Sequence, residues 1–243
     1  MGEFERRVAV VTGGTRGIGR AIVERLSGEG CTTWIWARNE EAGAAVASTL
    51  PLCRFARVDV SDSASVAVAA KRVLEEDGHV DFLVCNAGIV RDRAMLRLKE
   101  TLWDDVLDVN LKGAYLCIHA LLRALMRSRD GAIVCVGSVV GEMGNAGQTN
   151  YAAAKAGLEG MIRSLAKEVG GRGLRANVLA PGFVATEMTA GLGEDWKEKL
   201  VERIPLGRVA EPAEIADVAA FLLSHRASYI TGQVIGVNGG LFP

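Results

Sequence analysis

Short apolar segments recur along the chain, and stretches with a helical pattern of ten or more residues separate them. Val, Ile and Leu dominate these segments, which are residues 8–12, 31–36, 53–58, 81–85, 132–137, 175–180 and 234–237. Near-continuous apolar strands that alternate with helices are typical of a parallel sheet covered on both faces, because each right-handed crossover places a helix against the sheet. The pattern predicts a doubly wound α/β fold with a parallel seven-stranded sheet.

Capping residues mark the limits of several of the helices. Starts are predicted at Asp62 after Ser61, at Thr101, at Tyr151 after Thr149 and Asn150, and at Glu211–Pro212, and ends at Gly28, Gly78 and Gly170–Gly171. No low-complexity linker divides the 243 residues, 49% of which are apolar, so we expect a single domain over 1–243. A polar insert at about 182–205 follows the sixth strand, where substrate-binding segments usually lie.

Composition removes several classes of function. The formal charge is −1 and the basic residues are scattered, which argues against a nucleic-acid partner. The five cysteines form no CxxC pair and the three histidines are far apart, so neither a disulfide framework nor a metal site is indicated. The start of the chain lacks an apolar leader, and no apolar run reaches the roughly 18 residues of a membrane span. We expect a cytoplasmic protein without a membrane partner.

A glycine-rich turn lies between the first strand and the first helix. Gly13, Gly17 and Gly19 have the spacing GxxxGxG. Glycines permit a tight turn and a close backbone approach, and the helix amino end offers free N–H groups to a pyrophosphate. A glycine-rich turn alone is weak evidence, but its place in a βαβ unit predicts a Rossmann-type dinucleotide site. The residues that we expect to line this turn are Gly13, Thr15, Arg16, Gly17, Ile18 and Gly19.

The end of the second strand favours NADPH over NADH. An NAD site normally offers a carboxylate there for the ribose 2′-hydroxyl, whereas this strand ends in Ala37 and Arg38. Arg38 and Arg16 could bind a 2′-phosphate, because guanidinium groups match phosphate oxygens; the alternative is two solvated surface arginines. The adenosine is expected beside the ends of the third and fourth strands, at Asp59, Val60, Asn86, Ala87 and Gly88, although Asp59 and Asn86 could instead stabilise turns.

Ser138, Tyr151 and Lys155 are candidates for a reaction centre. Ser138 ends the fifth strand and Tyr151 opens the next helix, so both are expected at the carboxyl edge of the sheet, beside the cofactor. Lys155, one helical turn after Tyr151, is predicted to favour the phenolate and thereby lower the pKa of Tyr151, which is about 10 in free tyrosine. Tyr151 would then donate a proton to a carbonyl oxygen, to which Ser138 also donates a hydrogen bond. The alternative is an ordinary exposed Tyr/Lys pair on a helix.

Asn110 is a polar residue within an otherwise apolar helical segment. It either bonds locally to the carbonyl four residues earlier or takes part in a proton relay.

Together, the segments TGGTRGIG, CNAG and YAAAK, with Asn110, Ser138 and Pro181–Gly182, resemble the short-chain dehydrogenase/reductase family across essentially the whole chain. The resemblance implies that Asn110, Ser138, Tyr151 and Lys155 form a catalytic tetrad in which Lys155 feeds a proton relay. It also implies that Thr186 binds the carboxamide of the cofactor. The remaining cofactor contacts expected from it are Tyr151, Lys155, Pro181, Gly182 and Val184. Cys85 departs from the family pattern, which has Asn there, and puts local hydrogen bonding near the cofactor in doubt.

Within the family, GIVRDRAMLRLKE, PGFVATEMT and SYITGQVIGVNGG are similar to the branch that reduces 3-oxoacyl thioesters on acyl carrier protein. This implies NADPH-dependent formation of the (R)-3-hydroxyacyl thioester in fatty acid elongation, by a homotetramer built on residues 113–128, 151–169 and the C-terminal strand. The carrier is expected to dock at Arg129 and Arg172, unless these are solvated surface residues. Two readings compete with this one. The first is acetoacetyl-CoA reductase or another short-chain ketoreductase, and the second is a nucleotide-sensing module, which the presence of Tyr151 and Lys155 disfavours.

Overall fold

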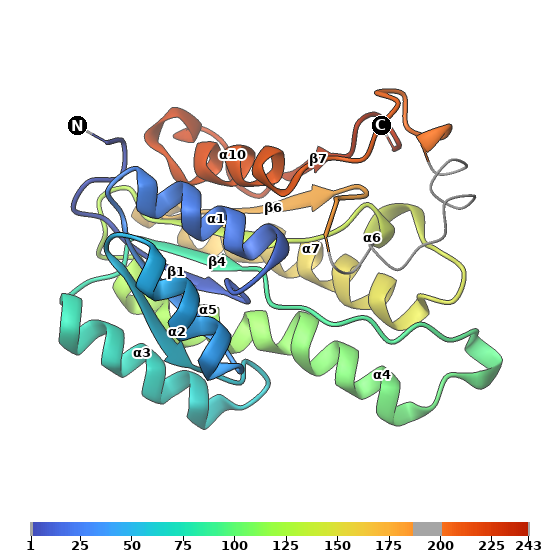
Figure 1. Cartoon of the computed structure of the whole chain (residues 1–243), viewed down its shortest axis with the longest axis horizontal. Helices are drawn as coiled ribbons and strands as arrows, with labels where there is room; N and C mark the ends of the chain where they lie inside the picture. Colours follow the sequence, from blue (N-terminus) through green and yellow to red (C-terminus); the bar gives the residue numbers. More distant parts are fainter. Residues whose placement is uncertain (1, 187–200, 243) are drawn as a thin grey trace.

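The computed structural model of the chain describes residues 2–186 and 201–242. Within these ranges seven parallel strands form one sheet in the order β3-β2-β1-β4-β5-β6-β7 (Figure 1). The strands are β1 (Val8–Thr12), β2 (Thr32–Ala37), β3 (Cys53–Arg57), β4 (Phe82–Cys85), β5 (Ala132–Val136), β6 (Arg175–Pro181) and β7 (Val234–Val237). The predicted doubly wound α/β fold is confirmed. The strand order reverses between β1 and β4.

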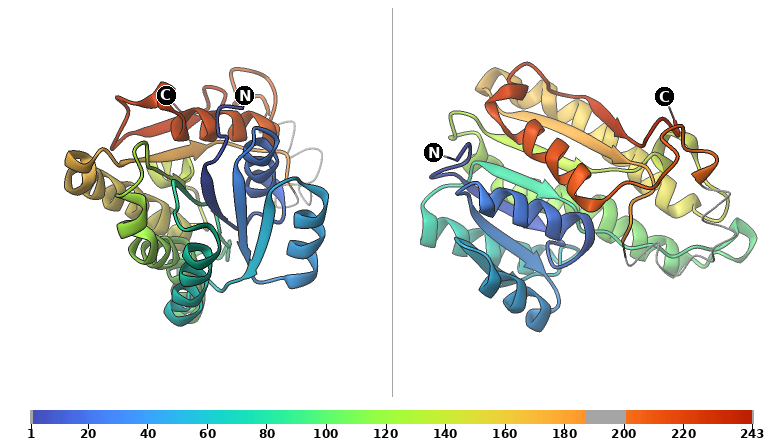
Figure 2. Two further views of the ribbon diagram at one scale, coloured as in Figure 1. Left: turned by 90° about the vertical axis from the view of Figure 1, so that its left-hand side faces the viewer. Right: turned by 45° about the horizontal axis from the view of Figure 1, so that its top comes forward.

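Helices cover both faces of the sheet (Figure 2). The α-helices of the described residues are α1 (Gly17–Gly28), α2 (Glu40–Thr49), α3 (Ser63–Asp77), α4 (Glu100–Leu107), α5 (Gly113–Leu125), α6 (Val140–Met143), α7 (Thr149–Val169) and α10 (Pro212–Leu223). One core contains side chains from α1, α2 and α10, and the other contains side chains from α3, α5 and α7. Successive residues of β1 enter opposite cores, since Val8 and Val10 face α3 and α5 while Ala9 and Val11 face α1. Burial on both faces explains the continuous apolar pattern.

Several predicted helix limits match the structure. Asp62 caps α3, accepting a hydrogen bond from the N–H of Ala64 at 2.9 Å, and Gly78 ends that helix in the left-handed conformation with φ 77°. Glu211 and Glu214 form a capping box at the start of α10. The start of α7 is two residues earlier than predicted, which places Tyr151 in the first turn of that helix.

Two further predictions concern the substrate-binding insert and the number of domains. Of the substrate-binding insert expected at about 182–205, residues 187–200 lie outside the described residues. The single-domain organisation stays a prediction. In the part of the chain that the structure describes, no helix combines the length and apolarity that crossing a membrane requires.

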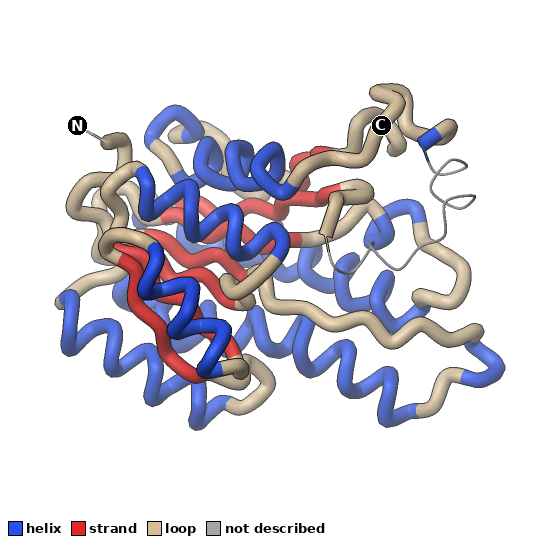
Figure 3. The backbone as a smooth tube through the Cα atoms, viewed as in Figure 1, coloured by secondary structure: helices blue, strands red, loops and turns tan. Residues whose placement is uncertain are grey.

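A long segment connects β4 to α4 and is called the arm below. The arm comprises residues 88–99 and contains one short 3₁₀ helix, η1 (Met95–Arg97). Figure 3 shows it as an extended loop that runs away from the sheet before the chain turns back into α4. Between α4 and α5, the chain forms a π-helical turn, η2 (Asp108–Lys112). The base of the arm and this turn both lie next to the candidate site.

Candidate active site

The candidate catalytic residues gather at the carboxyl edge of the sheet. Ser138 lies two residues beyond β5, and Tyr151 and Lys155 lie on the first two turns of α7. The glycine turn follows β1, which pairs with β4, and β4 pairs in turn with β5. The site therefore lies at the point where the strand order reverses, the usual ligand-binding place in open α/β sheets.

Tyr151 is partly buried, and its pKa reflects that. Burial raises the pKa of the phenol above its ordinary value, a hydrogen bond with the Ser138 side chain lowers it, and the negative charge of Asp92 raises it. The Ser138 side chain therefore lies beside the phenol of Tyr151. A phenol with a raised pKa stays protonated at neutral pH, which is the state that a proton donor needs.

Lys155 is buried, with 4% of its surface exposed. Its Nζ donates a hydrogen bond to the carbonyl oxygen of Val136 at 2.7 Å and lies 5.5 Å from the centroid of the Tyr151 ring. Burial lowers the pKa of the Lys155 ammonium to about 8. The ammonium therefore lies over the face of the tyrosine ring and donates its hydrogen bond to the last residue of β5.

The prediction that Lys155 lowers the pKa of Tyr151 is wrong for this structure. The influences on the pKa of Tyr151 are burial, Ser138 and Asp92, and burial outweighs the others. The physical reason is the position in which the lysine side chain is held, because its Nζ donates to the Val136 carbonyl and lies over the Tyr151 ring. The sequence spacing placed the two residues one turn apart but could not fix where the ammonium points.

Asn110 lies in the π-helical turn and is 1% exposed. Its Oδ1 accepts a hydrogen bond from the N–H of Ile89 at 2.8 Å, and its Nδ2 donates to the carbonyl of Ile89 at 3.0 Å. The side chain thus binds the base of the arm, not the carbonyl four residues earlier. π-Helical turns occur frequently at functional sites. A relay role for Asn110 stays a prediction.

Two polar residues that precede Tyr151 were not singled out as functional from the sequence. Asn150 is fully buried and hydrogen-bonds to the arm, to α4 and to the backbone of Tyr151. Gln148 Nε2 donates to both carboxylate oxygens of Asp92 at 3.1 and 3.0 Å. The sequence signal was an amide next to the candidate acid, which we interpreted only as a helix start.

The glycine turn has the properties that a dinucleotide needs. Gly13 and Gly17 have φ values of 68° and 52°, in the left-handed region that favours glycine. A Cβ at Gly19 would overlap the Asn86 side chain and the Gly13 carbonyl. The first turn of α1 contains no acidic residue, and its N-cap, Arg16, makes no side-chain capping bond, so its N–H groups suit a phosphate. These residues fit a nicotinamide dinucleotide.

The expected adenosine side shows local turn chemistry as well. Asp59 Oδ1 accepts hydrogen bonds from the N–H and the hydroxyl of Ser61 at 3.0 and 2.6 Å, and the nearby positive charge of Arg38 helps to lower the pKa of Asp59. Asn86 Nδ2 donates to the carbonyl oxygens of Thr12 and Gly13 at 3.0 and 3.1 Å. The turn-stabilising alternatives for Asp59 and Asn86 are thus observed, and their adenosine contacts stay predictions.

The remaining expected cofactor residues lie at or just beyond the carboxyl ends of the strands. Thr186 lies against the glycine turn, because a Cβ at Gly17 would come within 3.3 Å of Thr186 Cγ2. The others are Thr15 and Ile18 near the start of α1, Val60 after β3, Ala87 and Gly88 after β4, and Pro181, Gly182 and Val184 at the end of β6. Cys85 ends β4 and is buried, and Asn86 keeps its hydrogen bonds to the turn beside it.

Arg129 and Arg172 lie at the opposite side of the sheet from the candidate site, where the strands β5 and β6 begin. Arg129 is in the loop before β5, and Arg172 is in the 3₁₀ helix η3 (Gly170–Arg172) before β6. Both side chains belong to exposed residues. Within one chain they are therefore separated from Ser138 by the length of a strand.

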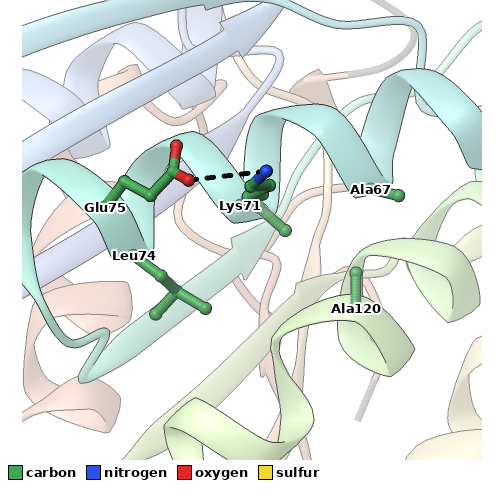
Figure 4. A pocket seen from close by; sticks show the side chains of 6 residues that line it. Ala67, Lys71, Leu74, Glu75 and Ala120 are labelled. Carbon is green, nitrogen blue, oxygen red and sulfur yellow. Dashed lines mark ion pairs between the residues drawn. The ribbon is translucent and has the colours of Figure 1, made fainter.

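A cavity of about 410 Å³ lies between α3 and α5, away from these residues. Figure 4 shows its lining, in which Lys71 and Glu75 form an ion pair with an N–O distance of 3.5 Å. Both side chains are largely exposed, and the rest of the lining is Ala67, Ala70, Leu74 and Ala120. We assign no chemistry to this cavity. In the described residues, no group of three or more His, Cys, Asp and Glu side chains could hold a metal ion.

Comparison with known proteins gives matches over nearly the full length of the chain. A family model described as "Enoyl-(Acyl carrier protein) reductase" matches residues 13–242. The 3-oxoacyl-[acyl-carrier-protein] reductase of Escherichia coli strain K12 is 44% identical over 98% of each chain. The proteins of the same name from Chlamydia muridarum and Vibrio harveyi are both 45% identical, over 97% and 98% of each chain.

A glycine turn that suits a dinucleotide lies beside Ser138 and Tyr151 at one sheet edge, and together with these matches it defines an oxidoreductase with a nicotinamide cofactor. The extent of the match identifies the group more closely. The chain belongs to the short-chain dehydrogenase/reductase family.

Proposed function

We propose that the chain catalyses the NADPH-dependent reduction of a 3-oxoacyl thioester, carried on acyl carrier protein, to the (R)-3-hydroxyacyl thioester in fatty acid elongation. The observation that carries this proposal is the 44–45% identity, over almost the whole of both chains, to reductases of that name. The convergence of Ser138 and Tyr151 beside the glycine turn supports it.

The residues divide the chemistry between them. A nicotinamide cofactor, when bound, supplies the hydride. Tyr151 donates its phenolic proton to the substrate oxygen, and Ser138 stabilises that oxygen by hydrogen bonding. The ammonium of Lys155 lies over the ring of Tyr151, and its lowered pKa of about 8 makes it a proton donor that can feed return of a proton to the phenolate after the transfer. Asn110 supports the site by holding the base of the arm.

The preference for NADPH follows from the residues at the end of β2. Ala37 supplies no carboxylate for a ribose 2′-hydroxyl, and the exposed Arg38 offers a guanidinium to a 2′-phosphate, with Arg16 at the start of α1 as its partner. Replacing Arg38 by Ala should raise the KM for NADPH by about tenfold, since a charge-assisted bond to phosphate is lost, and leave the KM for NADH unchanged. Equal changes for both cofactors would remove Arg38 from this role.

The substrate is tested by following NADPH absorbance in single turnovers. Acetoacetyl groups on acyl carrier protein and on coenzyme A should both react, with the carrier-bound substrate preferred. A preference for coenzyme A would favour acetoacetyl-CoA reductase instead. A 2-enoyl thioester serves as the third substrate, because the description of the matching family model names enoyl reduction. Oxidation of NADPH by the enoyl substrate alone would refute the proposal.

We also propose a cytoplasmic homotetramer that receives the carrier at Arg129 and Arg172. The surfaces available for assembly are the exposed faces of α5 and α7 and the open side of β7, which among the described strands pairs only with β6. Because both arginines lie at the edge opposite Ser138, a carrier docked there would serve the site of a neighbouring chain. Reversing both charges should raise the KM for carrier-bound substrate and spare a small thioester; equal effects on both substrates would refute docking there. The mass in solution tests the tetramer.

A further inference from the structure

Residues 92 and 93 of the arm form hydrogen bonds with the residues that lead into α7. The N–H of Arg93 donates to the carbonyl oxygen of Gly147 at 2.8 Å. The carboxylate of Asp92 accepts two hydrogen bonds from Gln148. Contacts of this kind bring a segment near residue 92 against one near residue 148, beside the candidate acid Tyr151.

Asn150 makes the central connection in this region. It is fully buried. Its Nδ2 donates to the carbonyl oxygens of Arg91 at 3.2 Å and Leu102 at 3.1 Å, and its Oδ1 accepts a hydrogen bond from the N–H of Tyr151 at 2.9 Å. The N–H groups in the first turn of a helix have no carbonyl four residues earlier within the helix, so this bond satisfies a donor that would otherwise need another partner. One amide thus joins the arm, α4 and the catalytic helix.

A cavity of about 360 Å³ lies between the arm and α4. It is lined by Val90, Arg91, Asp92, Arg93 and Leu102. Two of these residues, Arg91 and Leu102, are the ones whose carbonyl oxygens Asn150 binds. Any movement of the arm relative to α4 therefore changes the hydrogen bonds of Asn150.

We propose that Asn150 is a positioning residue, which fixes the first turn of α7 to the arm and to α4 and thereby keeps the Tyr151 hydroxyl beside Ser138. Because Asn150 also binds the arm, a displacement of the arm would shift the first turn of α7 and with it the Tyr151 hydroxyl. The catalytic consequence rests on the proposed function, in which Tyr151 is the acid. The mechanical link between the arm and Tyr151 does not depend on it.

The ionisable surroundings of Tyr151 provide a readout of this link. Asp92 faces it from the arm, Lys155 lies at its ring face, and Ser138 is hydrogen-bonded to it. Besides burial, which has the largest influence, the charge of Asp92 raises the pKa of Tyr151. A loosened arm should therefore change the ionisation of Tyr151, which a merely structural role of Asn150 would leave unaltered.

The main test is Asn150→Asp, which keeps the shape and the acceptor but removes both donors and adds a buried charge. Tyr151 should then ionise at a higher pH, and kcat should fall by about 10- to 100-fold, with cofactor Kd within about twofold of wild type. Tyrosinate absorbance, measured against the corresponding Tyr151→Phe double variant, isolates this residue from the other two tyrosines. The control is Thr149→Asp, which adds the same charge at an exposed position on the same turn and should shift the titration less.

A second variant, Asn150→Ala, removes the bonds without adding charge. The arm, which carries the charge of Asp92, is then held less firmly near Tyr151. Tyr151 should therefore ionise at a lower pH, and the amides of Ile89 and Arg93 should exchange hydrogen faster. Wild-type titration and kcat in both folded variants, with only a lower Tm, would overturn the proposal. If neither variant folds, slow amide exchange at Tyr151 in the unmutated chain supports the proposal and fast exchange overturns it. A wild-type chain without reductase activity would refute the proposed function, while the tyrosinate titration would still decide this inference.

Discussion

Replacing Lys155 by Met should change how the stability of the protein depends on pH. Burial lowers the pKa of Lys155 from 10.5 to about 8 in the folded chain. Because the unfolded chain then binds more protons between these two values, the free energy of unfolding must rise with pH across that window. The whole window corresponds to about 3 kcal/mol, of which about 1 kcal/mol falls between about pH 8 and pH 9. Methionine fills nearly the same volume and cannot titrate.

The assay is urea unfolding of both proteins at a series of pH values, with the free energy of the variant subtracted from that of the wild type. Subtraction removes other groups that titrate in this range, such as Cys53, whose pKa burial raises to about 11. The difference should rise by about 1 kcal/mol between about pH 8 and pH 9. Lys167→Met, at an exposed position of the same helix, is the matched control and should give a flat difference. A flat difference for Lys155→Met would mean that its ammonium is not buried as described.

Two further pairs of substitutions test the packing at the glycine turn and the polar network at the amino end of β4. Gly19→Ala would place a Cβ on the side chain of Asn86, so calorimetry should show at least about tenfold weaker cofactor binding and urea unfolding a loss of about 1–3 kcal/mol. Gly160→Ala, where a Cβ meets no atom within 4 Å, should instead stabilise α7 by about 0.5–1 kcal/mol. Asp81→Asn removes a buried carboxylate that binds a guanidinium, a hydroxyl and a backbone N–H, and should cost about 2–4 kcal/mol in urea unfolding. Asp105→Asn, at an exposed position, should cost under about 0.5 kcal/mol; costs as large as that of Asp81→Asn would contradict this account of the network.

The fold could be predicted closely because its determinants are local in the sequence. The central strands β1, β4, β5 and β6 are buried along their whole length, and residues such as Asp62 and Gly78 cap the helices where the pattern ends. The parallel topology then places the residues after each strand at one edge of the sheet, which is why Gly13 and Ser138 could be assigned to the same region. The predicted and observed strand limits differ by no more than one residue at either end.

The parts that the sequence could not supply depend on contacts between distant segments. Neither the bond from Lys155 to the Val136 carbonyl nor the charge of Asp92 beside Tyr151 leaves a periodic pattern. Asn150 appeared as one more polar residue at a helix start, because the arm that it binds lies 59 residues earlier in the chain. Electrostatics of a buried site follow from side-chain directions, and these are set by tertiary packing.

The central claim is that the Tyr151 hydroxyl gives its proton to the substrate oxygen during reduction. It is tested most directly by single-turnover oxidation of NADPH with acetoacetyl-acyl carrier protein, comparing the wild type with Tyr151→Phe, which keeps the ring and removes only the hydroxyl. The account predicts a rate lower by a factor on the order of 10² to 10⁴ in the variant, with cofactor Kd unchanged. A variant that reduces the substrate at close to the wild-type rate would contradict it.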